Sequence, residues 1–204
     1  VYNTVKGGTG SGDVYLKSGS DWSVLTAFNK AGYEVVNQDF LAERKAYAAA
    51  NGGQEDIYNV AEVNTAAAQS DTAVFVISRT SAENADRKAE KGDYYLSDSE
   101  AKNLAIVASA YQKVVVVMNV GGVIYTNFYH GKAGRTAEDN LNRNKIEGLD
   151  ALLLMSQAGQ EGGNALVKVL NGTANPSGKL TDTWAVEYTD YASSPYFALH
   201  NGVD

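Results

Sequence analysis

The chain has 204 residues, of which 44% are hydrophobic, so it is long enough to form one large domain with an apolar core, or two small domains. Its formal net charge of -7 argues against general nucleic-acid binding, which requires a basic face that displaces phosphate counterions. No apolar run approaches the roughly 20 residues that span a bilayer, and no basic amphipathic stretch favours a membrane surface.

The chain contains no cysteine, which excludes disulfides, thiolate zinc sites, iron–sulfur clusters and cysteine nucleophiles. A cysteine-free chain fits a reducing compartment, so the cytoplasm is favoured over secretion, although a secreted domain of this size needs no disulfide. The chain opens at Val1 with polar and glycine-rich residues rather than a signal peptide. A start at Val1 rather than Met fits a fragment or a processed product.

Helical and strand patterns alternate from the first third of the chain onward. Residues 21–32 are expected to form a helix, capped by Ser20 or Asp21 and ended by Gly32. Residues 33–37 (YEVVN) follow as a short strand. Two more helices are expected in the sequences DFLAERKAYAAAN and EDIYNVAEVNTAAAQ, with two glycines between them.

Two β-branched runs, at residues 72–78 and 114–119, have no polar alternation. Such runs are typical of strands buried on both faces, as in a parallel sheet. The sequence between them, residues 97–112, is expected to form a helix, because Ser97 and Glu100 have the spacing of a capping box.

A third buried strand is expected at residues 149–156, and a last helix at residues 161–172. The alternation predicts an α/β fold, a three-layer sandwich with a mostly parallel sheet flanked by helices. The polar residues 130–145 are expected to form a long surface insertion.

Two glycine-containing segments resemble nucleotide-binding loops, but both fail on spacing. The segment GGTGSGDV, residues 7–14, lacks the third spacing of G-x-G-x-x-G and opens no helix. In GTANPSGKL, five residues separate Gly172 from Gly178 where a phosphate-binding loop requires four. The two histidines have no acidic neighbours at ligand spacing. The sequence therefore predicts no cofactor and no metal site, and it disfavours a nucleotide-binding protein.

The charged segment RTSAENADRKAEKGD, residues 79–93, follows a buried strand. A cluster of charges is most often a solvated loop. Its length, its place at the carboxyl end of a strand and its Glu83 also fit a catalytic loop. A glutamate acts as a general acid when its surroundings raise its pKa, but glycoside hydrolysis requires a second carboxylate across the scissile bond. Both interpretations stay open on this pattern alone.

Five motifs in order, KGGTGSGDV, AVFVISRTSAENADRK, VVVVMNVGGVI, GQEGGNALVKVLNG and NPSGKLTDTW, resemble the second, α/β-sandwich domain of glycoside hydrolase family 3. The resemblance is to the β-glucosidase-like members, and it runs from about Lys6 to Trp184. It implies a retaining enzyme that hydrolyses terminal β-linked sugars. In such an enzyme a (β/α)8 barrel supplies an aspartate nucleophile and the sandwich supplies the acid/base glutamate.

The resemblance also implies roles for individual residues. Glu83 matches the acid/base glutamate, and Asp86 and Arg87 match an Asp-Arg pair that positions the loop. The glycine-rich segment that includes Gly8, Thr9, Gly10 and Ser11 is expected at the rim of the pocket, facing the barrel. The implied partners are the barrel domain of the parent chain and a β-linked sugar.

Two features depart from the family pattern. The family commonly has Gly-Glu-Gly where this chain has Ala82-Glu83-Asn84, which restricts the backbone around the glutamate. A barrel requires about 250 residues, and the family's sandwich usually begins with a strand and a helix before the glycine-rich segment. Residues 1–204 are therefore expected to be one sandwich domain of a larger enzyme, without the barrel and without the first strand. The alternative is a non-catalytic carbohydrate-binding or scaffold module on the same fold.

Overall fold

The computed structural model of the protein describes residues 6–7, 13, 15–17, 23–80, 87–131 and 144–197. The strands are β1 (Thr72–Arg79), β2 (Lys113–Val120) and β3 (Ala151–Leu154). The α-helices are α1 (Val24–Lys30), α2 (Gln38–Ala50), α3 (Val60–Ala67), α4 (Asp98–Ala110), α5 (Asn127–His130), α6 (Gly162–Leu170) and α7 (Ser194–Phe197). Two 3₁₀ turns are η2 (Gly159–Glu161) and η3 (Tyr188–Asp190).

The three strands form one parallel sheet in the order β1-β2-β3. In its register Val76 pairs with Val117, and Val117 pairs with Leu153 on its other side. Parallel neighbours require crossovers, and α4 makes the one between β1 and β2. The predicted parallel sheet of uninterrupted apolar strands is confirmed.

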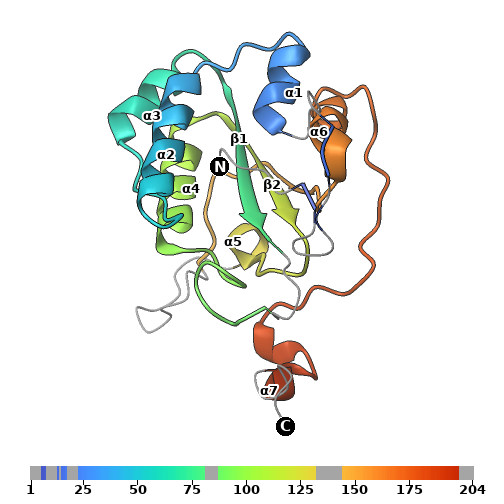
Figure 1. Cartoon of the computed structure of the whole chain (residues 1–204). Helices are drawn as coiled ribbons and strands as arrows, with labels where there is room; N and C mark the ends of the chain where they lie inside the picture. Colours follow the sequence, from blue (N-terminus) through green and yellow to red (C-terminus); the bar gives the residue numbers. More distant parts are fainter. Residues whose placement is uncertain are drawn as a thin grey trace.

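Helices cover both faces of the sheet (Figure 1). On one face Phe75 and Ile77 of β1 pack in a cluster with Val63 of α3 and Leu104 of α4. On the other face Val76 of β1 packs in a second cluster with residues of β2, α1 and α6, which are Val117, Val24 and Leu166. Because successive strand residues point to opposite faces, both faces of β1 require apolar side chains. The predicted three-layer sandwich is confirmed.

The start of α4 and the end of α6 lie where the sequence signals predicted them. At the start of α4 the Ser97 hydroxyl accepts a hydrogen bond from the Glu100 N–H at 3.0 Å, and the Glu100 carboxylate accepts one from the Ser97 N–H at 2.8 Å. This is the predicted capping box. After α6, Gly172 has a φ of 77°, a left-handed conformation that glycine adopts without strain and that ends the helix.

Two elements in the first third of the chain begin later than predicted. Helix α1 begins at Val24, with Ser23 in the N-cap position; the predicted caps Ser20 and Asp21 lie outside the described residues. Helix α3 begins at Val60 rather than Glu55, because the Asn59 side chain caps it by accepting a hydrogen bond from Ala61 N–H at 2.9 Å.

The residues just before α3 are held in place by a side chain of α4. Asn103, which is fully buried, accepts a hydrogen bond from Tyr58 N–H and donates one to the Asp56 carbonyl, both at 2.8 Å. These bonds use backbone groups that a helix would have paired within itself. The predicted helix is therefore replaced by a bonded loop at this point.

Residues 33–37, predicted as a strand, pair with no strand among the described residues. Most of the predicted insertion at residues 130–145 lies outside the described residues, because residues 132–143 are not among them. The helices within the described residues are all too short or too polar to cross a membrane.

Candidate functional site

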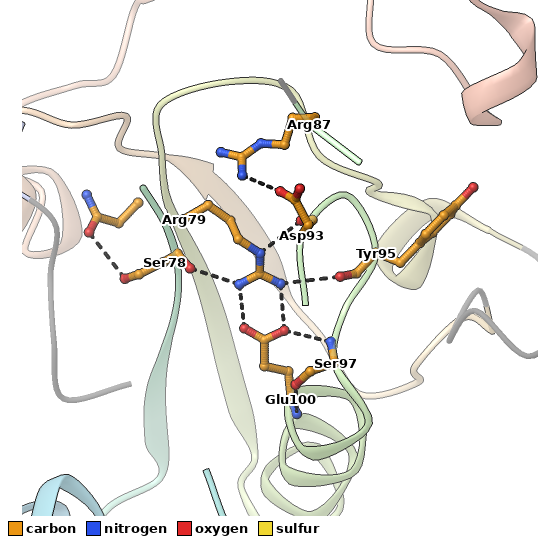
Figure 2. A network of polar contacts seen from close by, with 8 residues as sticks. Ser78, Arg79, Arg87, Asp93, Tyr95, Ser97 and Glu100 are labelled. Atoms are coloured by element: carbon orange, nitrogen blue, oxygen red, sulfur yellow. Dashed lines mark hydrogen bonds and ion pairs between the residues drawn. The ribbon is translucent and has the colours of Figure 1, made fainter. Parts of the chain in front are cut away.

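The carboxyl end of β1 is occupied by a buried ion pair. Arg79, the last residue of the strand, is 7% exposed, and Glu100 in the first turn of α4 is 8% exposed. The guanidinium donates to both carboxylate oxygens at 2.6 Å (Figure 2). A bidentate pair of this kind fixes orientation as well as distance. It fastens the end of β1 to the start of α4.

All five N–H donors of the Arg79 guanidinium have partners. Besides the two bonds to Glu100, the side chain donates to the carbonyls of Asp93 at 2.9 Å, Ser78 at 2.8 Å and Tyr95 at 3.3 Å. Two of these carbonyls belong to the segment that returns from the charged loop toward α4. Arg79 therefore joins the start of this loop to its return.

A second ion pair closes the loop nearer to its centre. Arg87 donates to Asp93 Oδ1 at 2.5 Å, and the N–H of Lys88 donates to Asp93 Oδ2 at 2.8 Å. Arg87 also reaches back to the Thr80 carbonyl at 3.4 Å. We call Thr80, Arg87 and Asp93 the loop base. It brings the residues on the two sides of segment 81–86 together at the edge of the sheet.

A cluster of tyrosines packs beside the loop base. Tyr94, Tyr95 and Tyr125 are at most 3% exposed, and Tyr188 of η3 packs edge-on against Tyr94. Tyr125 N–H donates to the Tyr94 carbonyl at 2.8 Å. Burial raises the pKa of Tyr94 well above its ordinary value, so its hydroxyl stays neutral. The aromatic packing fixes the returning arm of the loop against the body of the domain.

The ends of β2 and β3 meet the end of β1 at the same edge. The Ser78 hydroxyl donates to Asn119 Oδ1 at 3.2 Å, and Asn119, which is fully buried, donates to the Ser156 carbonyl at 2.7 Å. Ser156 has a φ of 55°, a left-handed conformation that non-glycine residues rarely adopt. The next residue, Gln157, donates to the Arg79 carbonyl at 3.2 Å. The three strand ends are therefore linked by polar side chains.

The chain also reaches this edge near its beginning, since the N–H of Gly159 donates to the Lys6 carbonyl at 2.8 Å. Lys6 and Gly7 are described, whereas the predicted rim residues lie outside the described residues; they are Gly8, Thr9, Gly10 and Ser11. The glycine-rich segment thus starts at the carboxyl edge of the sheet. Its predicted contact with a pocket stays a prediction.

Of the predicted residues of the charged loop, only Arg87 lies within the described residues. Glu83 and Asp86 lie outside them, so their predicted roles stay predictions. Arg87 lies at the end of segment 81–86, where it binds Asp93 and Thr80. Across the described residues no group of three or more His, Asp or Glu side chains could bind a metal ion.

The sequence analysis did not identify three residues that hold the loop in place. These are Arg79, Asp93 and Glu100, the last of which was assigned only to the capping box. For Arg79 the sequence did contain a signal. A charged residue that ends a fully buried strand cannot stay unpaired, because an isolated buried charge is costly. Nothing in the spacing identified Glu100 as its partner, since the capping box alone accounts for a glutamate there.

In this parallel α/β sandwich the three strand ends and the charged loop that follows β1 meet at one carboxyl edge. Such an arrangement is typical of α/β domains that place their chemistry at that edge. Residues 2–203 match the family described as the Glycosyl hydrolase family 3 C-terminal domain. The chain belongs to this family, as the resemblance implied.

Curated relatives and solved structures agree with this assignment. The chain is 32% identical to Beta-glucosidase A of Butyrivibrio fibrisolvens, covering 97% of this chain and 26% of the relative. It is 33% identical to a beta-glucosidase of Ruminococcus albus, covering 96% of this chain and 20% of the relative. The structure resembles beta-glucosidase 3B of Thermotoga neapolitana with a TM-score of 0.78 and 30% identity, covering 95% of this chain and 27% of that one. The chain thus spans a fifth to about a quarter of the length of these proteins.

Proposed function

We propose that this chain is the domain of a retaining β-glycosidase that supplies the acid/base glutamate to an active site completed by a (β/α)8 barrel of the parent protein. The observation that supports this most directly is the loop base. Segment 81–86, which contains Glu83, is tied at both ends to the carboxyl edge of the sheet by Arg87, Asp93 and Thr80. A solvated surface loop does not require an ion pair and hydrogen bonds that hold its two ends together.

The arrangement of the hydrogen bonds and ion pairs around Asp93 favours a role in positioning the loop. Asp93 accepts hydrogen bonds from both Arg87 and the Lys88 N–H, and its own carbonyl accepts from the buried Arg79. Arg79 is in turn fixed by Glu100 in α4. Misplacement of a catalytic group by about 1 Å can cost about 100-fold in rate. A glutamate that acts as general acid in the pocket of another domain must be held in position, and the loop base can hold it.

The chemistry follows from the proposed role of Glu83. As a general acid its carboxyl group protonates the oxygen of the leaving group while the aspartate of the barrel bonds to the anomeric carbon. As a general base the resulting carboxylate then takes a proton from the water that releases the sugar, which gives net retention. Arg87 keeps Glu83 in place through Asp93, and Asp86 assists it.

The substrate class is proposed from the relatives. The matched proteins of Butyrivibrio fibrisolvens and Ruminococcus albus are named beta-glucosidases. We therefore expect the parent protein to act on terminal β-linked glucose or a closely related sugar. The non-catalytic module remains the competing function, and the following experiment separates the two.

The test replaces Glu83 by Gln in the full-length parent protein, with Glu90→Gln as a matched control. Glu90 is an exposed glutamate of the same charged segment and makes no side-chain contact assigned to the loop base. Loss of a general acid/base costs typically 10²- to 10⁴-fold in rate. We expect a loss of that size for Glu83→Gln on an aryl β-glucoside with a poor leaving group, and near-normal activity for Glu90→Gln.

Two further readouts distinguish loss of proton transfer from misfolding. An activated nitrophenyl leaving group departs without a proton, so the first step should be largely preserved in Glu83→Gln. Azide, which needs no general base, should then accelerate turnover and yield a glycosyl azide. If Glu83→Gln behaved like the Glu90→Gln control in all three assays, the catalytic function would be wrong and the non-catalytic module would be supported.

A further inference from the structure

After α6 the chain crosses the molecule as a long segment without helix or strand, residues 171–187, and reaches the region beyond the carboxyl ends of β1 and β2 (Figure 1). Most of this segment is exposed. Toward its end the chain packs on the domain again, since Trp184 lies against the main apolar cluster and Tyr188 lies against the tyrosine cluster. We call residues 184–191 the strap.

The strap is hydrogen-bonded within itself and to the body of the domain. The Asn127 side chain, 8% exposed at the start of α5, donates a hydrogen bond to the Val186 carbonyl at 2.8 Å. Within the strap, Ala185 N–H donates to the Tyr191 hydroxyl at 2.9 Å, which closes residues 185–191 into a turn. The strap therefore has a defined structure, and its backbone is fastened to α5.

The strap covers the residue that follows Asp93 of the loop base. The rings of Tyr188 and Tyr94 have their centroids 5.2 Å apart and are inclined at 73°, an edge-to-face pair. Such pairs are favourable beyond the area that they bury. Tyr191 of the strap packs against the same cluster, and Tyr94 is 2% exposed. Contact with the strap therefore contributes to the burial of Tyr94.

The tyrosine cluster is separate from the two apolar clusters that cover the faces of the sheet. Its buried members are Tyr94, Tyr95 and Tyr125, and the first two belong to the segment that returns from the charged loop. Loss of a contact at this cluster therefore leaves the packing of the sheet in place, whereas it acts directly on the return of the loop. This separates an effect of the strap on the loop from an effect on the stability of the whole fold.

The return of the loop links the position of Tyr94 to that of Asp93. Tyr94 N–H donates a hydrogen bond to the Lys88 carbonyl at 3.2 Å, and Lys88 N–H donates to the Asp93 carboxylate at 2.8 Å. The same carboxylate accepts the ion pair from Arg87. A displacement of Tyr94 therefore shifts Asp93, which is the partner of Arg87 in the loop base.

We propose that the strap holds Tyr94 in place through Tyr188 and thereby fixes the loop base, so that Tyr188 is a positioning residue for the charged loop. The effect of Tyr188 on catalysis rests on the proposed function of Glu83, whereas its effect on the loop base does not. The two effects are therefore tested separately.

The first test measures amide hydrogen exchange in residues 88–95 of the full-length parent protein, with β2 as internal reference. Tyr188→Ala removes the ring that packs on Tyr94, and Tyr188→Phe keeps that ring. Tyr111→Ala is the matched control, because Tyr111 is a partly buried tyrosine that packs against the main apolar cluster at the opposite end of α4.

We expect exchange in residues 88–95 to become about tenfold faster in Tyr188→Ala, because the return of the loop opens more easily without the aromatic contact. Exchange in β2 should stay unchanged in this variant, and Tyr188→Phe should exchange like the original protein. The proposal is wrong if Tyr188→Ala leaves exchange in residues 88–95 unchanged, or if Tyr111→Ala or Tyr188→Phe accelerates it equally.

The second test compares kcat/KM of the parent protein on two aryl β-glucosides, one with a poor leaving group and one with a dinitrophenyl group that departs without a proton. Because kcat/KM reports the steps up to departure of the leaving group, it responds to the general acid and not to the later general base. We expect Tyr188→Ala to lower kcat/KM for the poor leaving group by about 10- to 100-fold, as for a misplaced catalytic group. The value for the dinitrophenyl substrate should stay nearly unchanged, and Tyr111→Ala should be near normal on both.

Glu83→Gln, assayed in parallel, separates this inference from the proposed function. If Glu83→Gln shows the dependence on the leaving group and Tyr188→Ala does not, the positioning role of Tyr188 is wrong and the proposed function stands. If Glu83→Gln shows no such dependence, the proposed function is wrong, and hydrogen exchange alone decides whether the strap fixes the loop base.

Discussion

Glu55, in the loop before α3, is a carboxylate in an unfavourable position. Its Oε2 atom is buried and accepts no hydrogen bond among the described residues. Burial raises the pKa of Glu55 above its ordinary value of 4.5, and the nearby negative charges of Glu100 and Asp56 raise this pKa further. The ionised form of Glu55 therefore destabilises the folded state at neutral pH.

This position predicts a pH-dependent effect of Glu55→Gln. Because the folded state binds the Glu55 proton more tightly, the free energy of unfolding falls as the pH rises from 4.5 through the raised pKa. The amide removes this loss, so we expect the variant to be more stable than the original chain at pH 7 and the difference to vanish as the pH falls to 4.5. Urea unfolding at several pH values measures this. Glu90→Gln should show little effect at either pH, and a Glu55→Gln advantage that grew on acidification would contradict the assignment.

The sequence does not predict which charged residues of the loop pair with each other. The resemblance matches Arg87 to a residue that positions the loop, and this role stays a prediction; the structure shows Arg87 directly after segment 81–86, hydrogen-bonded to the Thr80 carbonyl. Asp93 follows it by six positions within a run of charges, and nothing in that run marks it as the partner of Arg87. Pairing among several nearby charges depends on the turn between them, which the sequence pattern does not specify.

At the scale of elements, the start of α4 combines two functions in one carboxylate. Glu100 closes the capping box with Ser97 and also receives the buried guanidinium of Arg79. The cap is a local interaction of the helix, whereas the ion pair joins the helix to the end of β1. Separate substitutions of Ser97 and Glu100 should distinguish the contribution of the helix cap from that of the ion pair.

We expect Glu100→Gln to destabilise the domain by about 3 kcal/mol, because it leaves a buried guanidinium without its carboxylate. Ser97→Ala removes only the cap and should cost about 1 kcal/mol. Urea unfolding of the two variants beside the original chain provides the measurement. Equal costs for the two variants would mean that the ion pair contributes little beyond the cap.

Among the elements, the sequence predicted best those whose signals are local. The β-branched runs of β1 and β2 and the capping box of α4 were all predicted and confirmed. The start of α3 was missed because Asn103, more than 40 residues away, bonds the preceding loop. Residues 33–37 have the composition of a strand but no partner among the described residues, and a strand forms only beside another strand.

At the scale of the whole molecule, the chain is expected to be inactive by itself. Glycoside hydrolysis with retention requires two carboxylates about 5–5.5 Å apart across the scissile bond, and we assign the nucleophile to the barrel. The purified chain should therefore release no aryl product from an aryl β-glucoside above the buffer rate, and Glu83→Gln should leave this rate unchanged. Hydrolysis by the chain that Glu83→Gln abolished would show that both carboxylates lie within this domain.

Among the described residues no strand pairs with the outer edge of β1, which has a consequence for how the domain behaves when it is produced alone. The outer edge of β1 has no proline and no charge between Thr72 and Ser78, so it has none of the usual features that keep sheet edges from joining. Uncharged β-branched segments of this length can stack between molecules. We therefore expect the domain, when it is purified alone, to associate through this edge as its concentration rises, which light scattering over a range of concentrations measures.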